Sequence, residues 1–263
     1  MGDSDDFSKK YTQANVAKDA AKYDEALFGQ WQTQLQKVLP NATSGLTSGI
    51  LVAMLCAQGR GDAAGALFSD SVASNKAHVL ELFAVIREAL TLSMGFVGLP
   101  NVMPAIFGSV AELKKGNITD IQVNQRPTFK DANYEETGRE VHQKIYRGVG
   151  NPEVAAMVAQ YFPDLSYLAT SSVFGYAIGG CEILPFRERE LVVVSAIIAL
   201  GASRQARSHC KAAIQLGNAP KVLEVLDEIA QNVARWNGRA LPDRLNVPQL
   251  VVELNAELAK LNA

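Results

Sequence analysis

The stretch that decides the fold is residues 185–231, PFRERELVVVSAIIALGASRQARSHCKAAIQLGNAPKVLEVLDEIAQ. Its apolar residues form runs of helical length, separated by glycine and proline. The pattern predicts three helices, at 187–200, 203–216 and 220–234. Residues 191–194 have the composition of a strand, but they belong to a longer apolar run, so we assign them to a helix.

Two polar residues stand out in this stretch, Glu190 in the first helix and His209 in the second. In an antiparallel hairpin about Gly201 they lie at comparable depth and can touch. Gln205 shares a small, apolar face with His209, so we expect both to point inward. A buried Glu–His pair can transfer protons near neutral pH, or it can be a structural hydrogen bond that closes the hairpin. The residues alone leave both interpretations open.

The rest of the chain has the same helical character and no sustained alternation of apolar and polar residues. We therefore predict an all-α fold. Further helices are expected at 11–38, 46–57, 62–73, 77–94, 103–115, from 139 onward, and at 151–161, 164–178 and 248–261.

The two halves of the chain share a pattern. Gly59 and Gly201 are separated by the same number of residues as Leu99-Pro100 and Leu241-Pro242. Three further pairs of short matching segments occur in the same order in the two halves, at nearly the same separation. We predict two tandem helical units packed as a pseudo-dimer: a degenerate copy at 1–120, a linker at 121–138, and a copy at 139–263 that carries Glu190 and His209. The matching positions in the first copy are Ser48 and Ala66 or Leu67.

Composition limits the classes of function. A net charge of −2 argues against sequence-independent nucleic-acid binding. The most apolar window, 89–108, is broken by glycines and prolines, so we expect no membrane association. Three scattered cysteines give no disulfide framework or zinc pair and fit a cytoplasmic location. The histidines are too scattered for a metal site, and we interpret His78 and His142 as surface residues.

A set of residues in the second half resembles the carboxymuconolactone decarboxylase family, which includes the alkyl hydroperoxidase D-type proteins. These residues are Arg189-Glu190-Leu191, Gly201, Gln205, His209, Ala213, Gly217 and Val222-Leu223-Glu224, with the segment 138–148 as a similar lead-in. The resemblance covers about 100 residues of the second half and about half as many of the first. It implies an all-α fold that assembles as a trimer or pseudo-hexamer.

The family contains two chemistries. Its peroxidase branch uses a Cys-x-x-Cys motif, but Ala202 and Gln205 occupy those two positions here. Its decarboxylase branch acts on a small carboxylated lactone from aromatic-compound breakdown and needs no metal or organic cofactor. Gln205 agrees with that branch.

The resemblance therefore favours a lyase acting on a small organic acid. His209 is the first candidate for the proton donor, with Glu190 as its orienting partner or in the reverse role. Arg204 and Arg187 are candidates for binding substrate carboxylates. Two alternatives remain at this stage: a thiol-dependent peroxidase that uses Cys210, and a non-catalytic, small-molecule-binding member whose Glu–His contact adjoins no pocket.

Overall fold

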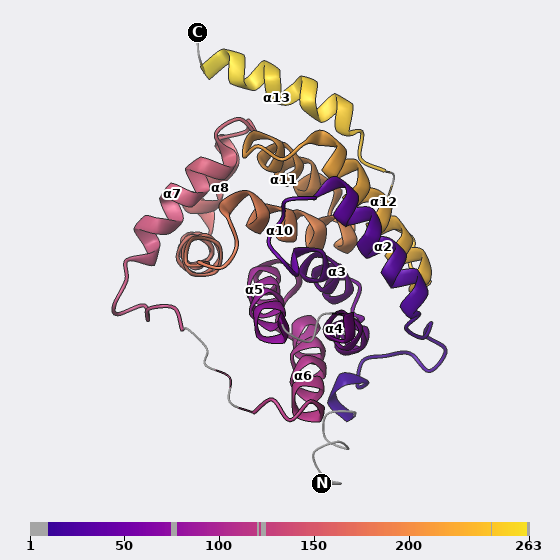
Figure 1. The fold of residues 1–263 in the computed structure, drawn as a ribbon. Coiled ribbons are helices and arrows are strands. Elements are labelled where there is room, and N and C mark those ends of the chain that lie inside the picture. The colour runs from indigo at the N-terminus through magenta and orange to yellow at the C-terminus, as the bar shows by residue number, and fades with distance from the viewer. Residues whose placement is uncertain (1–9, 75–77, 120, 122–124, 243, 262–263) are drawn as a thin grey trace.

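The computed structural model describes residues 10–74, 78–119, 121, 125–242 and 244–261. These residues form helices and no strand, as the sequence predicts (Figure 1). Over the same residues, no helix combines the length and the apolar character that crossing a bilayer requires.

The helices of the first half are α2 (Glu25–Val38), α3 (Leu46–Ala57), α4 (Gly61–Ser74), α5 (Val79–Val97) and α6 (Leu99–Lys115). Those of the second half are α7 (Tyr134–Tyr146), α8 (Glu153–Tyr161), α9 (Pro163–Leu168), the π-helix η2 (Ala169–Gly179), α10 (Phe186–Leu200), α11 (Ser203–Gln215), α12 (Pro220–Trp236) and α13 (Val247–Leu261).

Three predicted boundaries are wrong, each for a local reason. The first long helix, α2, begins at Glu25 rather than near residue 11, because Asp24 caps it by accepting a bond from the Leu27 amide at 3.1 Å. Helix α6 begins at Leu99 rather than at residue 103. Pro100 fits its first turn, because the backbone N–H that proline lacks would have no partner within the helix there. Helix α7 begins at Tyr134, inside the stretch expected to be a linker, of which residues 122–124 lie outside the described part.

Two apolar helices form the centre of the molecule. All twelve residues of α3 and eleven of the fifteen in α10 are buried, and the two helices pack against each other. A helix that is apolar on all sides is expected to be enclosed in this way. The run 191–194 lies in α10 and is fully buried, so its assignment to a helix is confirmed.

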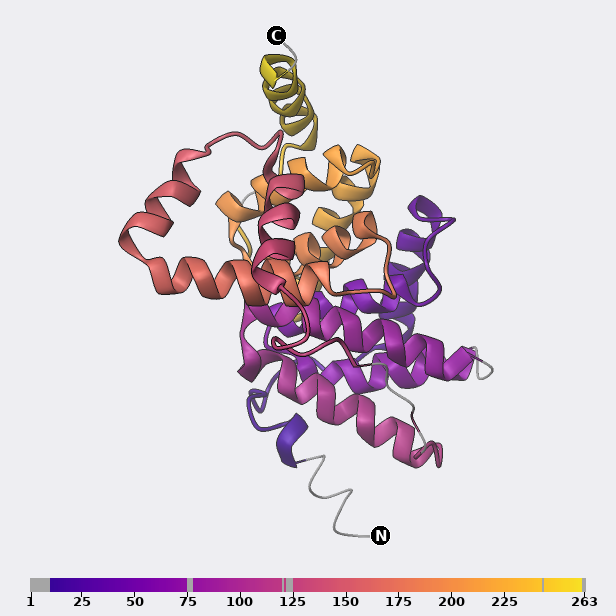
Figure 2. The ribbon, with the colours of Figure 1, turned by 90° about the vertical axis from the view of Figure 1, so that its left-hand side faces the viewer.

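The helices from α8 to η2 form an arm that projects from the body (Figure 2). Helix α9 continues directly into η2, and no described residue of α8 or α9 is buried. The inner part of η2 packs against α7. We call 153–168 the α8–α9 arm.

Helix α7 and η2 touch through their backbones. A Cβ atom added at Gly138 would lie 1.9 Å from the carbonyl oxygen of Thr170, and one at Gly175 would lie 2.0 Å from that of Tyr134. Only glycine permits this approach. The contact determines how α7 is placed beside the hairpin of α10 and α11.

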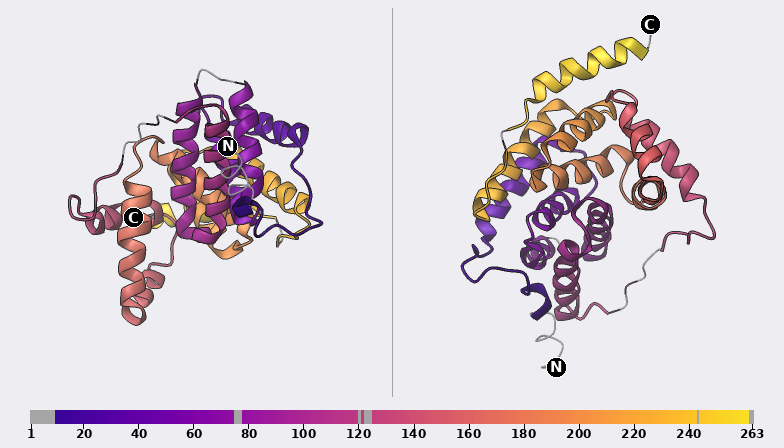
Figure 3. Two further views of the ribbon diagram at one scale, coloured as in Figure 1. Left: turned by 90° about the horizontal axis from the view of Figure 1, so that it is seen from below. Right: turned by 180° about the vertical axis from the view of Figure 1, so that it is seen from behind.

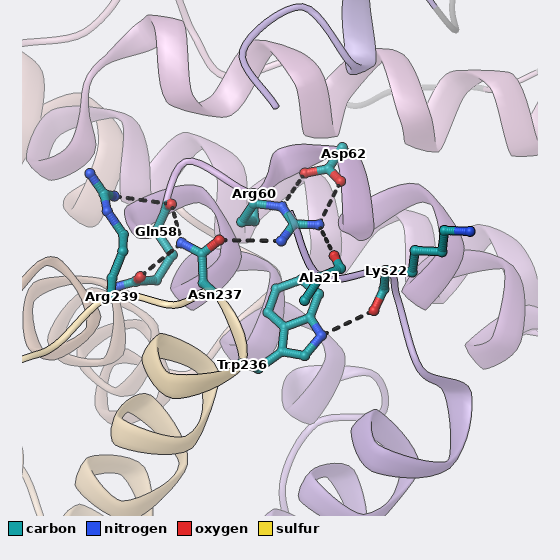
Figure 4. Close-up of polar contacts among 8 residues, drawn as sticks. All are labelled: Ala21, Lys22, Gln58, Arg60, Asp62, Trp236, Asn237 and Arg239. Carbon is teal, nitrogen blue, oxygen red and sulfur yellow. Dashed lines mark hydrogen bonds and ion pairs between the residues drawn. The ribbon is translucent and has the colours of Figure 1, made fainter. Parts of the chain in front are cut away.

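A polar network around the buried Arg60 joins the first and second halves of the chain (Figure 4). The Arg60 guanidinium donates to the Ala21 carbonyl at 2.7 Å, to Asn237 at 3.2 Å and to Asp62, and it lies 4.2 Å from the centre of the Trp236 ring. The network holds the turn after α3 against the end of α12. Beside it, α2 runs along α12 (Figure 3, right).

Candidate functional site

The centre of the candidate site is a buried hydrogen bond between a glutamate on α10 and a histidine on α11. His209 Nδ1 lies 2.6 Å from Glu190 Oε1, and the two residues are 2% and 1% exposed. The hairpin turns at Gly201, whose φ of 80° is left-handed and suits glycine. The predicted contact between Glu190 and His209 is thereby confirmed, while its role is not yet decided.

A third residue, Tyr146, extends the pair to a triad; we did not predict it from the sequence. The Tyr146 hydroxyl on α7 lies 3.0 Å from His209 Nε2, so both ring nitrogens of the imidazole have a partner. Burial raises the pKa of Tyr146 above its usual value, and the charge of Glu190 raises it further, whereas Arg204 acts in the opposite direction. The hydroxyl is therefore protonated at neutral pH.

Aromatic rings surround this triad. Phe96, from the end of α5, meets the His209 ring edge-on at 5.5 Å, so the first half of the chain also contributes to the site. His142 lies one helical turn before Tyr146, with its ring 4.6 Å from the phenol and 5.0 Å from Phe174. Our interpretation of His142 as a surface residue is wrong, because its side chain is half-buried against Tyr146 of α7 and Phe174 of η2.

The triad opens on a groove of about 1420 Å³ between the α8–α9 arm and the body. The walls come from α7, the arm, η2, α11 and α13, and both Tyr146 and His209 line it. Glu190 lies behind His209 and is not part of the lining. The Tyr146 hydroxyl bonds to the Nε2 side of His209, which faces away from Glu190.

The three predicted substrate-binding residues differ in position. Arg204 and Gln205 line the groove from the first turn of α11, and both are exposed, so the expectation that Gln205 points into the core is wrong. Arg204 donates to the Ser208 hydroxyl at 2.8 Å and makes no ion pair with any described carboxylate. Arg187 is exposed on α10 and is not among the residues that line the groove.

The cysteine thiols lie in the buried core rather than in the groove. All three cysteines are buried. Burial raises the pKa of Cys56 to about 12 and also raises that of Cys210, to which the charges of Asp227 and Glu190 contribute. A thiolate is the reactive form of cysteine, so this setting is unfavourable for thiol chemistry. Within the described part of the chain, no cluster of three or more His, Cys, Asp or Glu side chains could hold a metal ion.

Comparison with known proteins adds little to this geometry. No family model matches the chain. Over 94 residues the chain is 29% identical to "Peroxisomal protein 2" of Saccharomyces cerevisiae, a similarity that covers 36% of this chain and 33% of that protein. The chain thus matches about a third of the length of this curated relative. The resemblance to carboxymuconolactone decarboxylases stays a prediction.

Proposed function

We propose that this protein is a cofactor-free decarboxylase of the γ-carboxymuconolactone decarboxylase type. Its substrate is a small carboxylated lactone, or a related organic acid from aromatic-compound breakdown. The observation that carries the proposal is the buried Glu190–His209 pair. Only the phenol of Tyr146 separates it from a groove that Arg204 also lines, and Arg204 makes no ion pair with any described carboxylate.

Each element of the site has a function in such a reaction. Loss of CO₂ leaves an electron pair that spreads into the conjugated lactone carbonyl as a dienolate, which must then receive a proton. The Glu190–His209 pair supplies that proton. Arg204 binds a carboxylate of the substrate, because a guanidinium forms paired hydrogen bonds to a carboxylate, and Gln205 lies beside it on the same turn.

The alternatives have less support. We expected a non-catalytic member to show the Glu–His contact without an adjoining pocket, and here a groove adjoins it. A peroxidase that uses Cys210 requires an accessible thiolate, and this thiol is buried with a raised pKa.

We also infer that the two halves are copies of one unit, packed as a pseudo-dimer. Helices α3 to α6 have counterparts in α10 to α13 in the same order, and the two central helices pack together. Ser48, which stands at the position of Glu190, accepts a hydrogen bond from Gln32 at 2.9 Å, and the position of His209 is taken by Ala66 or by the buried Leu67. Only the second copy then carries the acid–base pair.

A second copy of this chain is the partner that we propose for the α8–α9 arm, within a trimer or pseudo-hexamer. Seven large apolar side chains on the arm are 45–67% exposed. At about 100 Å² each they offer about 700 Å², close to the ~800 Å² that one partner gives to a stable interface. Residues 153–168 contain two acidic residues and no lysine or arginine, so an anionic membrane is a poor partner.

For location, we propose the cytoplasm, because unpaired, buried cysteines fit a reducing compartment. The similarity to a yeast protein named as peroxisomal makes the peroxisome the alternative. Fluorescence microscopy of the tagged chain beside a peroxisomal marker distinguishes the two.

The function is tested by CO₂ release from γ-carboxymuconolactone. We expect the wild-type protein to release CO₂ and His209→Ala to lower kcat at least ~100-fold, the usual contribution of a general acid. Glu190→Gln should also be impaired, while circular dichroism of both variants stays that of the wild type.

Two controls accompany this test. His78→Ala removes an exposed histidine and is expected to retain full activity. Cys210→Ala should do the same, because the proposed reaction does not use a thiol; peroxide reduction by the wild type that Cys210→Ala abolishes would favour the peroxidase. A wild-type protein that releases no CO₂, or a fully active His209→Ala variant, contradicts the proposal.

A further inference from the structure

Tyr146 stands between the acid–base pair and the groove. The imidazole of His209 is only 2% exposed, with Glu190 on one nitrogen and the phenol on the other. A substrate in the groove therefore cannot reach Nε2 unless it displaces the Tyr146 hydroxyl. The hydroxyl itself belongs to a residue that lines the groove.

We propose that Tyr146 is a catalytic residue that passes the proton to the substrate, while His209 and Glu190 resupply it. This inference rests on the proposed decarboxylase function and deepens it. His209 then acts as a proton carrier behind the phenol and does not touch the substrate.

The electrostatics of the site agree with a donor. Burial and the nearby Glu190 carboxylate keep the phenol protonated at neutral pH by raising its pKa. When the proton leaves, the phenolate is held between His209 Nε2 and the positive charge of Arg204, which favours the anion. Phe96, His142 and Phe174 place aromatic rings around the triad.

The step balances without any co-reactant except water. In the reacting form, His209 carries a proton on both nitrogens, Nδ1–H donates to Glu190, and Nε2–H donates to the phenol oxygen. The bond between the lactone carbon and its carboxylate breaks, CO₂ leaves, and the electron pair enters the conjugated carbonyl. A C–H bond forms with the phenol proton, Nε2–H refills the phenol oxygen, and a proton from water restores Nε2.

The first test is Tyr146→Phe, assayed for CO₂ release from γ-carboxymuconolactone. We expect kcat to fall ~100-fold or more, with KM changed only a few-fold, since the ring and the groove remain. The matched control is Tyr134→Phe, which removes another bonded hydroxyl from α7, at 2.9 Å from the Pro127 carbonyl. It is expected to retain wild-type activity.

A second variant separates proton transfer from mere positioning of His209. Difluorotyrosine at position 146 keeps the hydroxyl and its contact but makes the phenol more acidic. If Tyr146 is the donor, the alkaline limb of the kcat–pH profile moves to lower pH by about one unit or more. A tyrosine that only orients His209 leaves that limb in place. This variant also tests the inference if Tyr146→Phe fails to fold.

The outcomes are distinct. Wild-type turnover together with a fully active Tyr146→Phe variant, or with an unmoved alkaline limb, overturns the role of Tyr146 and leaves the decarboxylase proposal intact. Absence of CO₂ release by the wild type overturns the proposed function, and the Tyr146 step with it.

Discussion

His142 and His209 lie in one aromatic cluster on either side of the Tyr146 ring. Their surroundings differ in charge. His209 has a carboxylate at 2.6 Å, whereas His142 packs against the rings of Tyr146 and Phe174. Burial lowers the pKa of His142, and the electrostatic interaction with the nearby His209 lowers it further.

This shift predicts how stability responds to acid. A histidine with a lowered pKa in the folded state binds its proton more readily when unfolded. The stabilising contribution of neutral His142 is therefore fully present above the unfolded pKa of about 6.5 and is lost as the pH falls through the lower, folded pKa. We expect the Tm of His142→Gln to fall less than that of the wild type between about pH 7 and about pH 5. The control His78→Gln, at an exposed ring, should follow the wild type.

The Glu190–His209 contact could be predicted from the sequence, whereas the contact with Tyr146 could not. Glu190 and His209 lie on two helices joined by one glycine, so hairpin geometry alone brings them together. Tyr146 is 63 residues from His209 in sequence, and its contact depends on how α7 packs. One signal was available: Gly138, His142 and Tyr146 are spaced four apart and therefore share one helix face.

At the scale of elements, the backbone contact between α7 and η2 determines where Tyr146 lies. Gly138→Ala would place a methyl group against the Thr170 carbonyl, so the helices must separate. We expect a loss of about 1–3 kcal/mol in the free energy of unfolding, the usual cost of overpacking. Denaturant unfolding measures this change, and a lower kcat should accompany it as Tyr146 shifts.

The control for that variant is Gly29→Ala on α2. A Cβ at Gly29 meets no described atom within 4 Å, so the higher helix propensity of alanine should stabilise the protein by about 0.5–1 kcal/mol. If Gly138→Ala is equally stable, the close approach of α7 and η2 does not determine the placement of the site.

Helix positions could largely be predicted from apolar periodicity, and the turn at Gly201 followed from local sequence. That α8 and α9 project from the body could not be predicted, because their apolar residues have the composition of a buried helix. Periodicity reveals which face of a helix is apolar, but not whether this chain or a second copy covers it. The start of α7 was missed because a polar segment with a capping asparagine, Asn133, resembles a linker.

At the scale of the whole molecule, the exposed arm predicts self-association. We expect the wild-type protein to sediment as a trimer or larger assembly. Replacing Tyr161, Phe162 and Leu165 by serine should shift it toward the monomer without lowering its Tm much, because none of the three is buried. Analytical ultracentrifugation checks this prediction.

The matched control is Val252→Ser, at a side chain on α13 that is also exposed, and it should sediment like the wild type. A monomeric wild-type protein, or an unchanged assembly after the triple replacement, contradicts the role of the arm.

The Arg60 network also affects how the chain can fold while it is being synthesised. Arg60 emerges from the ribosome early. Trp236 and Asn237, which cover its guanidinium, are made much later, and Asn237 follows Arg60 by 177 residues. Until then, a cation that is buried in the finished protein has only its neighbours Asp62 and Ala21 as partners. The apolar faces of α3 that α10 and α12 cover are likewise open during this interval. The first half of the nascent chain therefore exposes apolar surface and a cation that become buried only after α10 and α12 have been synthesised.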